Sequence, residues 1–347
     1  MTRTLDADRA RLREHFAVAA FPDGGLLLHL FSGDFFELDR VRAAVWRAIV
    51  QATATEEVVD VIASALAIPR ATAFDIVERT VAQGLALENR PPDGIPRFED
   101  DTRVLSLRDR AGVLLTFDRQ ALRLHLGPGL ILQMQAGRNG LEEALRVFVP
   151  KILGSWYPLA LHASAVQMGT RTLLFSGDSG AGKTTTARLL VEEMEATRLI
   201  AEDMVLLSDL EDEASIVVGA EAAVHAWMAD ATQTLSALQD QSVDVEQLLL
   251  SLRAQSGRLP LRKIVFLDSA RRTGAAWRFG SLTSTATLRL LFVNSFIHSS
   301  TFPVLRSHLD ACGTLTSRLV AAEALAIPFG LTNLRAGLRA QIETIAS

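Results

Sequence analysis

Residues 177–184, GDSGAGKT, constrain the fold of this chain more than any other stretch of its 347 residues. They fit the pattern G-x-x-x-x-G-K-[ST], in which backbone N–H groups and a helix N-terminus cradle phosphate groups. The apolar run RTLLFS precedes the loop, and a helical pattern begins at its lysine. A strand, a Gly-rich loop and a helix in this order predict a nucleotide-binding loop in an α/β fold. The alternative is a Gly-rich turn before an ordinary helix.

The loop lysine stands out in the composition. Only three of the 35 basic residues are lysines, and Lys183 is one of them. Lysine is a compact point charge, which suits a tight phosphate cradle better than the planar arginine fork does. Lys183 is expected to reach the β- and γ-phosphates, and the Thr184 hydroxyl to ligate Mg²⁺. The expected cofactors are ATP and Mg²⁺, and the expected nucleotide-binding residues are Gly177, Asp178, Ser179, Gly180, Ala181, Gly182, Lys183, Thr184 and Thr185.

A histidine is expected beside this loop. The segment LHASAVQMGTRTLLFSG predicts two strands joined by a turn at Gly169 and Thr170. Antiparallel pairing around that turn places His162 opposite Gly177. Asp178 would then hold the His162 imidazole and fix its tautomer, which explains an acid inside a phosphate cradle. A purely structural role for His162 is the alternative.

Two adjacent acids, Glu202 and Asp203, follow the next apolar run, RLIA. In P-loop enzymes an acid at such a strand end holds the Mg²⁺ ion that bridges the phosphates. The sequence therefore assigns Asp203 to the metal and Glu202 to the catalytic base. Surface acids at a solvated turn are the alternative.

The N-terminal part has a different pattern. Residues 25–31 and 35–38 predict a hairpin, and helical patterns follow at 40–51, 55–67 and 70–84. Three prolines and a run of charge within 89–102 predict a boundary between domains 1–95 and 96–347. The second domain alternates strands with helices, including helices at 230–254, 284–293, 305–324 and 333–345.

Composition excludes several classes of function. The net charge is −5, one cysteine is present, and no run of about 18 apolar residues occurs. The N-terminus is charged and has no apolar signal core, so a cytoplasmic protein without membrane spans is expected. Residues 20–90 carry six arginines, no lysine and ten acids. Their net charge is negative, which is the wrong sign for binding nucleic acid.

Beyond these patterns, HASAVQMGTRTLLFSGDSGAGKTTTA with AEDMVLL resembles the kinase domain of HPr kinase/phosphorylase and its relatives. The resemblance implies an HPr kinase/PEP carboxykinase-like α/β domain and ATP- and Mg²⁺-dependent phosphorylation of a serine hydroxyl. It carries catalytic roles to His162, Lys183 and Glu202 and the metal role to Asp203. The family usually has two aspartates, whereas this chain has Glu202 first.

The N-terminal segment FFELDRVRAAVWRAI, with Trp46, and the helices after it resemble PqqD-like domains. These are small winged-helix α+β modules that bind the leader segments of ribosomally made peptides. The resemblance implies that residues 15–90 bind a leader by strand addition. A domain that only packs on the kinase is the alternative.

Together these features predict a kinase that phosphorylates a hydroxyl of a ribosomally made precursor peptide, with lasso-type peptides as the leading candidates. The expected partner is that peptide, with no nucleic acid and no membrane, and the chain could form a homo-oligomer. A kinase for a small molecule and a non-catalytic, nucleotide-gated peptide-binding protein are the alternatives.

Overall fold

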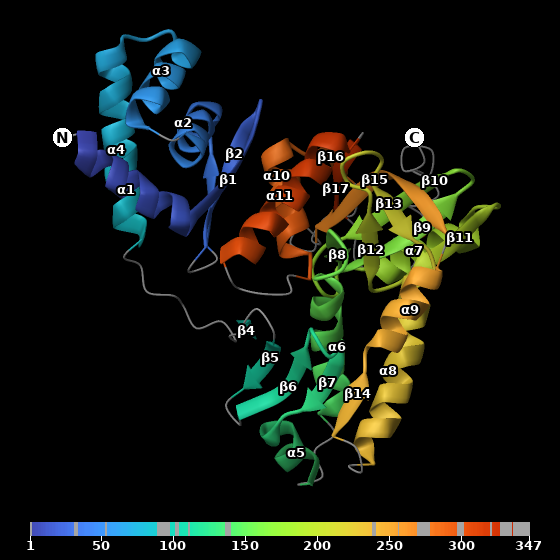
Figure 1. The fold of residues 1–347 in the computed structure, drawn as a ribbon. Coiled ribbons are helices and arrows are strands. Elements are labelled where there is room, and N and C mark those ends of the chain that lie inside the picture. The colour runs from blue at the N-terminus through green and yellow to red at the C-terminus, as the bar shows by residue number, and fades with distance from the viewer. Residues whose placement is uncertain are drawn as a thin grey trace. The chain divides into compact units, whose positions relative to one another are not determined.

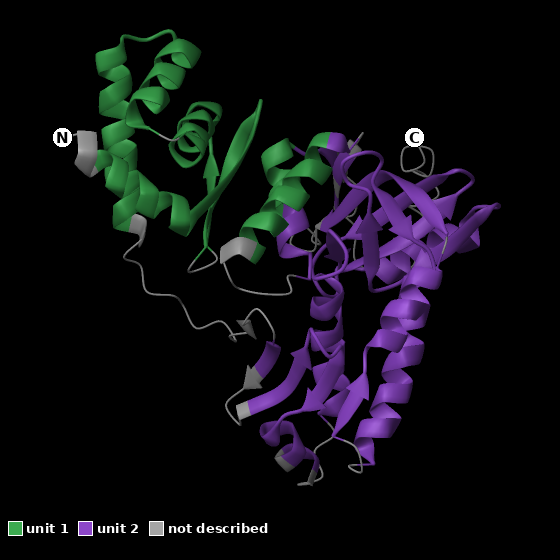
Figure 2. Cartoon of the chain, viewed as in Figure 1, with its two compact units in different colours: residues 1–95, 283–289, 300–317 green, residues 96–282, 290–299, 318–347 purple. Residues whose placement is uncertain are grey.

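The computed structural model describes residues 2–30, 34–52, 54–88, 98–100, 104–109, 112–135, 140–237, 241–255, 257–268, 278–296, 302–319, 321–326 and 335. The chain divides into two compact units (Figure 2). The first unit holds residues 1–95, 283–289 and 300–317, and the second holds 96–282, 290–299 and 318–347. The predicted boundary divides the chain once, whereas the first unit also takes in two later segments.

The first unit combines helices with a three-stranded antiparallel sheet of order β1-β2-β3. Its elements are α1 (Thr2–His15), β1 (Phe16–Phe21), β2 (Gly24–His29), β3 (Phe35–Leu38), α2 (Arg40–Gln51), α3 (Thr55–Leu66), α4 (Arg70–Glu88), the first part of α10 (Ser284–Val293), and α11 (Phe302–Arg318). Asp39 starts α2 because its carboxylate accepts the Arg42 N–H. Trp46 on α2 is buried, with its ring centroid 5.3 Å from that of Phe16.

Helices α2, α3 and α4 agree with the predicted ranges, although α4 continues to Glu88, but the sheet of this unit differs. The predicted strand at 25–31 corresponds to β2, which also pairs with β1 around a turn at Pro22 and Asp23. The predictions did not include β1 because FAVAAF is apolar throughout and lacks strand alternation. They also did not include α1. β2 is the central strand, and it pairs with β1 on one edge and with β3 on the other, so both of its edges are occupied. The winged-helix assignment itself stays a prediction.

The second unit is built on a mixed nine-stranded sheet whose main path runs β11-β9-β10-β15-β13-β12-β8. β15 also pairs with β17, which pairs with β16, and β10, β15 and β17 run parallel. These strands are β8 (Leu159–Leu161), β9 (Ala163–Met168), β10 (Arg171–Ser176), β11 (Thr197–Ala201), β12 (Val205–Ser208), β13 (Ser215–Val217), β15 (Arg258–Asp268), β16 (Arg278–Ser281) and β17 (Ala321–Ala326). Helix α7 (Lys183–Glu193) buries Ala187 and Leu190 against Phe175 of β10, which fixes the loop between them.

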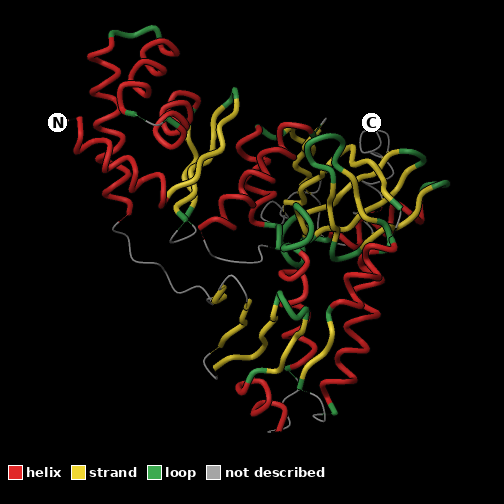
Figure 3. The backbone as a smooth tube through the Cα atoms, in the orientation of Figure 1, coloured by secondary structure: helices red, strands yellow, loops and turns green. Residues whose placement is uncertain are grey.

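A second sheet in this unit has five strands in the order β14-β7-β6-β5-β4 (Figure 3). The strands are β4 (Phe98–Asp100), β5 (Val104–Asp109), β6 (Gly112–Asp118), β7 (Arg123–Leu126) and β14 (Ser242–Asp244). The helices are α5 (Pro128–Gln135), α6 (Leu141–Leu153), α8 (Ala220–Ser236) and α9 (Glu246–Ala254). Figure 1 shows α6 and α8 extending from the nine-stranded sheet towards this one. One hydrophobic core joins the five-stranded sheet with α6, α8 and β12.

Two of the helices predicted for residues 96–347 are wrong in part. The range 230–254 contains only the last part of α8, which begins at Ala220, followed by β14 and α9. The break arises because β14 pairs with β7, which is far away in the sequence. The range 305–324 contains α11 and then β17. The β17 sequence AAEALA has helix-forming residues, but parallel pairing with β15 overrides that propensity. The predicted helix at 333–345 lies outside the described residues, apart from residue 335. None of the described helices is both long and apolar enough to cross a membrane.

Candidate active site

The Gly-rich loop joins β10 to α7 and depends on two glycines. Gly177 has φ +141°, and a Cβ there would lie 2.6 Å from the Leu267 carbonyl oxygen. Gly182 has φ +95° and precedes the first residue of α7. Any other residue would strain the backbone at both positions. The loop can therefore pass close to β15 and still direct its amides into the start of α7.

Lys183 folds over the loop that precedes it. Its ammonium donates to the carbonyl oxygens of Gly177 at 2.9 Å and Asp178 at 3.0 Å. Burial lowers the pKa of Lys183, while the charges of Asp203 and Asp178 raise it. The Lys183 ammonium is therefore a buried cation held inside the loop, at a place where phosphate oxygens would bind it.

The rest of the loop is open to a ligand. Asp178, Ser179, Gly180 and Thr185 are exposed. Gly180 has φ +74°, and a Cβ there would meet no atom within 4 Å. Ala181 is buried and donates its N–H to the Asp178 carbonyl oxygen at 3.0 Å, which closes the turn. These residues leave the loop exposed where phosphates would bind, with Thr184 at its α7 side.

His162 lies where the hairpin argument places it. β9 and β10 pair in the predicted register, from Met168 with Arg171 to Ala163 with Ser176. The predicted single strand before the turn is broken at His162, since β8 pairs with β12 and β9 with β10. The His162 N–H donates to the Asn294 carbonyl oxygen at 2.8 Å, which fixes the backbone at the break.

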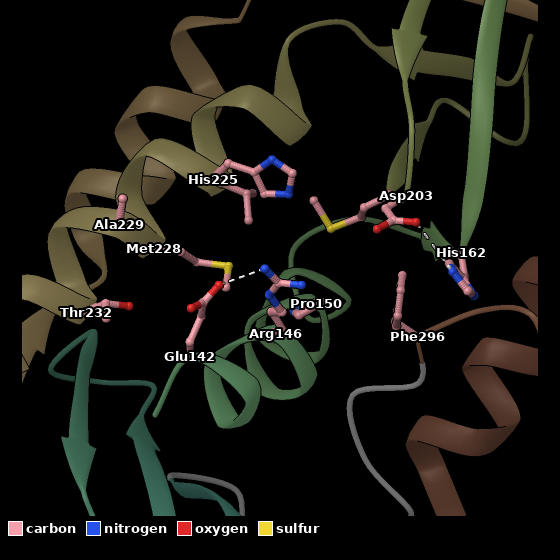
Figure 4. A pocket seen from close by; sticks show the side chains of 12 residues that line it. Glu142, Arg146, Pro150, His162, Asp203, His225, Met228, Ala229, Thr232 and Phe296 are labelled. Carbon is pink, nitrogen blue, oxygen red and sulfur yellow. Dashed lines mark hydrogen bonds and ion pairs between the residues drawn. The ribbon is translucent and has the colours of Figure 1, made fainter. Parts of the chain in front are cut away.

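The acid that faces His162 is Asp203 and not Asp178, so that part of the prediction is wrong. His162 Nε2 lies 3.8 Å from Asp203 Oδ1, which is too long for a direct hydrogen bond (Figure 4). Asp203 reaches His162 because the turn after β11 brings residue 203 to the end of β8. The sequence could not show this, since it depends on how β11, β9 and β8 share one sheet.

The two adjacent acids point in different directions. Arg188 on α7 holds the Glu202 carboxylate with contacts of 2.7, 2.8 and 3.1 Å. Asp203 is 72% exposed and faces His162. The Glu202 main chain faces α7, because its carbonyl oxygen accepts hydrogen bonds from the hydroxyls of Ser164 and Thr184. This hydrogen bond ties Thr184 to the turn that carries Asp203. Thr184 and Asp203 are the two predicted metal ligands.

Glu221 holds the turn that carries these acids. It lies in the first turn of α8 and is only 9% exposed. Its carboxylate accepts the backbone N–H of Glu202 at 2.7 Å, of Asp203 at 2.7 Å and of Met204 at 3.1 Å. Hydrogen bonds to a charged group contribute about 1.5–3 kcal/mol each to stability. The position of the Asp203 side chain therefore depends on a buried acid of α8.

A pocket of about 650 Å³ opens beside His162 and Asp203 (Figure 4). Its walls are one face of α6 and one face of α8. On α6 the lining residues are Glu142, Arg146 and Pro150, and on α8 they are Val224, His225, Met228, Ala229 and Thr232. Met204 and Phe296 complete the lining. Its volume is typical of a ligand site.

The residues present fit a nucleotide-bound Mg²⁺ ion. No cluster of three or more His, Cys, Asp or Glu side chains suited to a metal occurs among the described residues. Mg²⁺ does not require such a cluster, because it keeps several waters and binds one or two carboxylates together with substrate phosphates. Asp203 and the Thr184 hydroxyl, next to an open phosphate cradle, supply a set of oxygens of that kind.

The titration of His162 gives a first testable prediction. Burial and, to a lesser extent, the Lys183 charge lower the pKa of His162, while Asp203 opposes them. We expect an NMR titration to give a His162 midpoint below 6.5. Lys183→Met should raise that midpoint, and Asp203→Asn should lower it further. Because the folded-state pKa is below the unfolded one, the stabilising contribution is complete above pH 6.5 and is lost as the pH falls through the folded pKa. A midpoint above 6.5, or shifts of the opposite sign, would contradict this arrangement.

Sequence reasoning did not identify three parts of this site: Arg188, Glu221 and the pocket between α6 and α8. Arg188 follows Lys183 by five residues, and only the observed fold shows that it meets Glu202. Glu221 lies before the predicted helix at 230–254, so no helix start was expected at its position. The periodic spacing of Val224, Met228 and Thr232 was visible, but it is equally typical of a buried face.

In comparisons with known proteins, no protein-family model and no curated protein matches this chain. Among solved structures, the Hpr(Ser) kinase/phosphatase from Coxiella burnetii is similar, with 10% sequence identity and a TM-score of 0.22. The similarity covers 54% of this chain and 99% of the other. A TM-score this low does not establish a shared fold. The structure itself shows a mixed α/β architecture with a Gly-rich loop between a strand and a helix.

Proposed function

We propose that this protein is an ATP- and Mg²⁺-dependent kinase that transfers the γ-phosphoryl group to a hydroxyl. One observation carries the proposal: the Thr184 hydroxyl of the Gly-rich loop donates to the Glu202 carbonyl oxygen, one residue before Asp203, which lines a pocket together with His162. Phosphoryl transfer needs donors and cations around the phosphates and a place for the acceptor beside them. A calorimetric titration tests it first: ATP should bind more tightly with Mg²⁺ than with EDTA, and an absence of ATP binding would contradict the proposal.

Each residue has a role in this proposal. Lys183 and the amides of residues 177–185 bind the β- and γ-phosphates, and Asp203 and Thr184 bind Mg²⁺. That ion would neutralise charge that develops on the phosphates. The sequence assigns the base to Glu202, but Glu202 could take a proton from an acceptor only after it leaves Arg188. His162 lines the pocket and has a lowered pKa, so it is neutral near pH 7 and able to accept a proton. We therefore assign the base to His162.

We further propose that the acceptor is a residue, a serine in the first instance, of a ribosomally made precursor peptide whose leader binds the first unit. β3 is an edge strand, since it pairs only with β2 among the described residues. Alternate residues of β3 direct their N–H groups towards β2. The hydrogen bond from the His29 N–H to the Asp34 carbonyl oxygen shows that this alternation is counted from Asp34. The N–H groups of Phe35 and Glu37 therefore point away from β2, where an extended leader could accept them. A bound leader would also raise the local concentration of the attached acceptor.

Glu37→Pro tests the strand-addition proposal, because it removes one outward N–H and keeps the β2–β3 ladder. We expect it to weaken the binding of a labelled leader peptide at least tenfold, as measured by fluorescence anisotropy. Glu37→Ala is the matched control, since it also removes the Glu37–Arg289 ion pair but keeps the N–H. Equal leader affinity in both variants would mean that β3 does not bind the leader.

A further inference from the structure

The pocket beside His162 is elongated, as its lining shows. Residues 142, 146 and 150 are spaced four apart on α6, and residues 225, 228 and 232 follow one face of α8. At 1.5 Å of rise per residue, these faces extend for about 12 Å and about 10 Å. Figure 4 shows His162 and Asp203 at one end and Glu142 and Thr232 at the other. The pocket is therefore a groove along two helices that begins at the reacting groups.

The groove has an apolar floor and a charged far end. Val224, Met228 and Met204 are 2%, 9% and 5% exposed, so they form its floor. Methionine side chains adapt their shape to varied apolar partners. At the far end, Arg146 donates to Glu142 at 2.7 Å, and this pair is well exposed to solvent. Glu142 and Arg146 neutralise each other, so this end of the groove carries no net charge, and the Asp203 carboxylate lies at the other end.

We infer that this groove binds an extended peptide segment of the acceptor, with about three apolar residues on one side of the phosphorylated hydroxyl. An extended chain advances about 3.3 Å per residue, so about three residues fill 10 Å. The hydroxyl lies at the end that His162 and Asp203 line, which the groove shares with the proposed transfer site. This inference rests on the proposed kinase function and adds a specificity to it. The residues next to the acceptor are apolar, and charged residues there are disfavoured because they would lose solvent against Val224, Met228 and Met204.

The test uses synthetic peptides as probes. Each has one serine with three apolar, three acidic or three basic residues before or after it, and a polar tail for solubility. With the full chain, ATP and Mg²⁺, we expect kcat/KM to be at least tenfold higher for one apolar-flanked peptide than for its charged counterparts. Ala229 is exposed on the groove face of α8, so Ala229→Trp should fill the groove without disturbing the core. It should raise KM for that peptide at least tenfold and change kcat little.

The matched control is Ala226→Trp, since Ala226 is also exposed on α8 but does not line the groove. It should leave both constants unchanged. No flank preference, no transfer to any peptide, or equal KM values for both tryptophan variants would overturn the inference. The kinase proposal would survive those results if the chain still bound ATP with Mg²⁺ and phosphorylated another hydroxyl. A chain that does not bind ATP would overturn both.

Discussion

We expect His162→Gln to slow phosphoryl transfer at saturating ATP by about 10²–10⁴-fold, the usual range for the loss of a general base. Glutamine keeps a polar group of similar size but cannot take a proton near pH 7. Glu202→Gln slows transfer by less than about tenfold, because the Glu202 carboxylate is bound to Arg188 and does not line the acceptor pocket. Single-turnover measurements with labelled ATP give both rates without interference from product release.

Arg188→Ala separates the two assignments of the base. It frees the Glu202 carboxylate, which has an exposed fraction of 36% in its ion pair. If Glu202 is the base, this variant should transfer phosphate at least as fast as the parent, and Glu202→Gln should be almost inactive. Slow transfer by Glu202→Gln together with parental rates for His162→Gln would show that the base is Glu202.

Lys183→Met is the second variant with a large expected effect. We expect it to weaken the binding of ATP with Mg²⁺ by about 10–100-fold, which corresponds to losing a hydrogen-bonded charge of about 1.5–3 kcal/mol. It slows transfer by a further 10²–10³-fold or so, because donors aimed at developing charge act mainly in the transition state. Calorimetry measures the first effect and single-turnover kinetics the second.

The folded state serves as the control for that variant. Methionine fills nearly the same buried space, but the loop loses the donor to the Gly177 and Asp178 carbonyl oxygens. We expect the melting temperature of the protein without ATP to change by only a few degrees. Parental ATP affinity in a folded Lys183→Met protein would mean that the loop does not bind phosphate.

Much of the loop and hairpin could be predicted because their signals are local. The Gly-rich motif fixes a strand, a turn and a helix within 20 residues, and the turn at Gly169 fixes the register that places His162 beside Gly177. The direction of each acid could not be predicted in the same way. Whether Glu202 or Asp203 faces the pocket depends on Arg188 and Glu221, and the fold brings both to this turn.

The lysine argument was less specific than the sequence suggested. The structure places all three lysines in largely buried positions. Lys263 is 5% exposed and pairs with Glu323 at 3.0 Å, and burial lowers the pKa of Lys151 to about 8. Burial is therefore common to all three lysines, and Arg9, at 1% exposed, shows that arginine also occupies buried positions. Lys183 differs from the other two through the loop around it and not through its residue type.

The central claim is that a γ-phosphoryl group leaves a nucleotide held by residues 177–185 and reaches a hydroxyl beside His162. The most direct measurement is a single turnover of the full chain with γ-labelled ATP, Mg²⁺ and the apolar-flanked serine peptides, followed by mass spectrometry of the peptides. We predict label on the serine oxygen with ATP and Mg²⁺. Within the time in which the parent completes one turnover, we predict no label when EDTA removes the ion and almost none when Lys183→Met replaces the parent. Label found only in unreacted ATP or in inorganic phosphate would contradict the account.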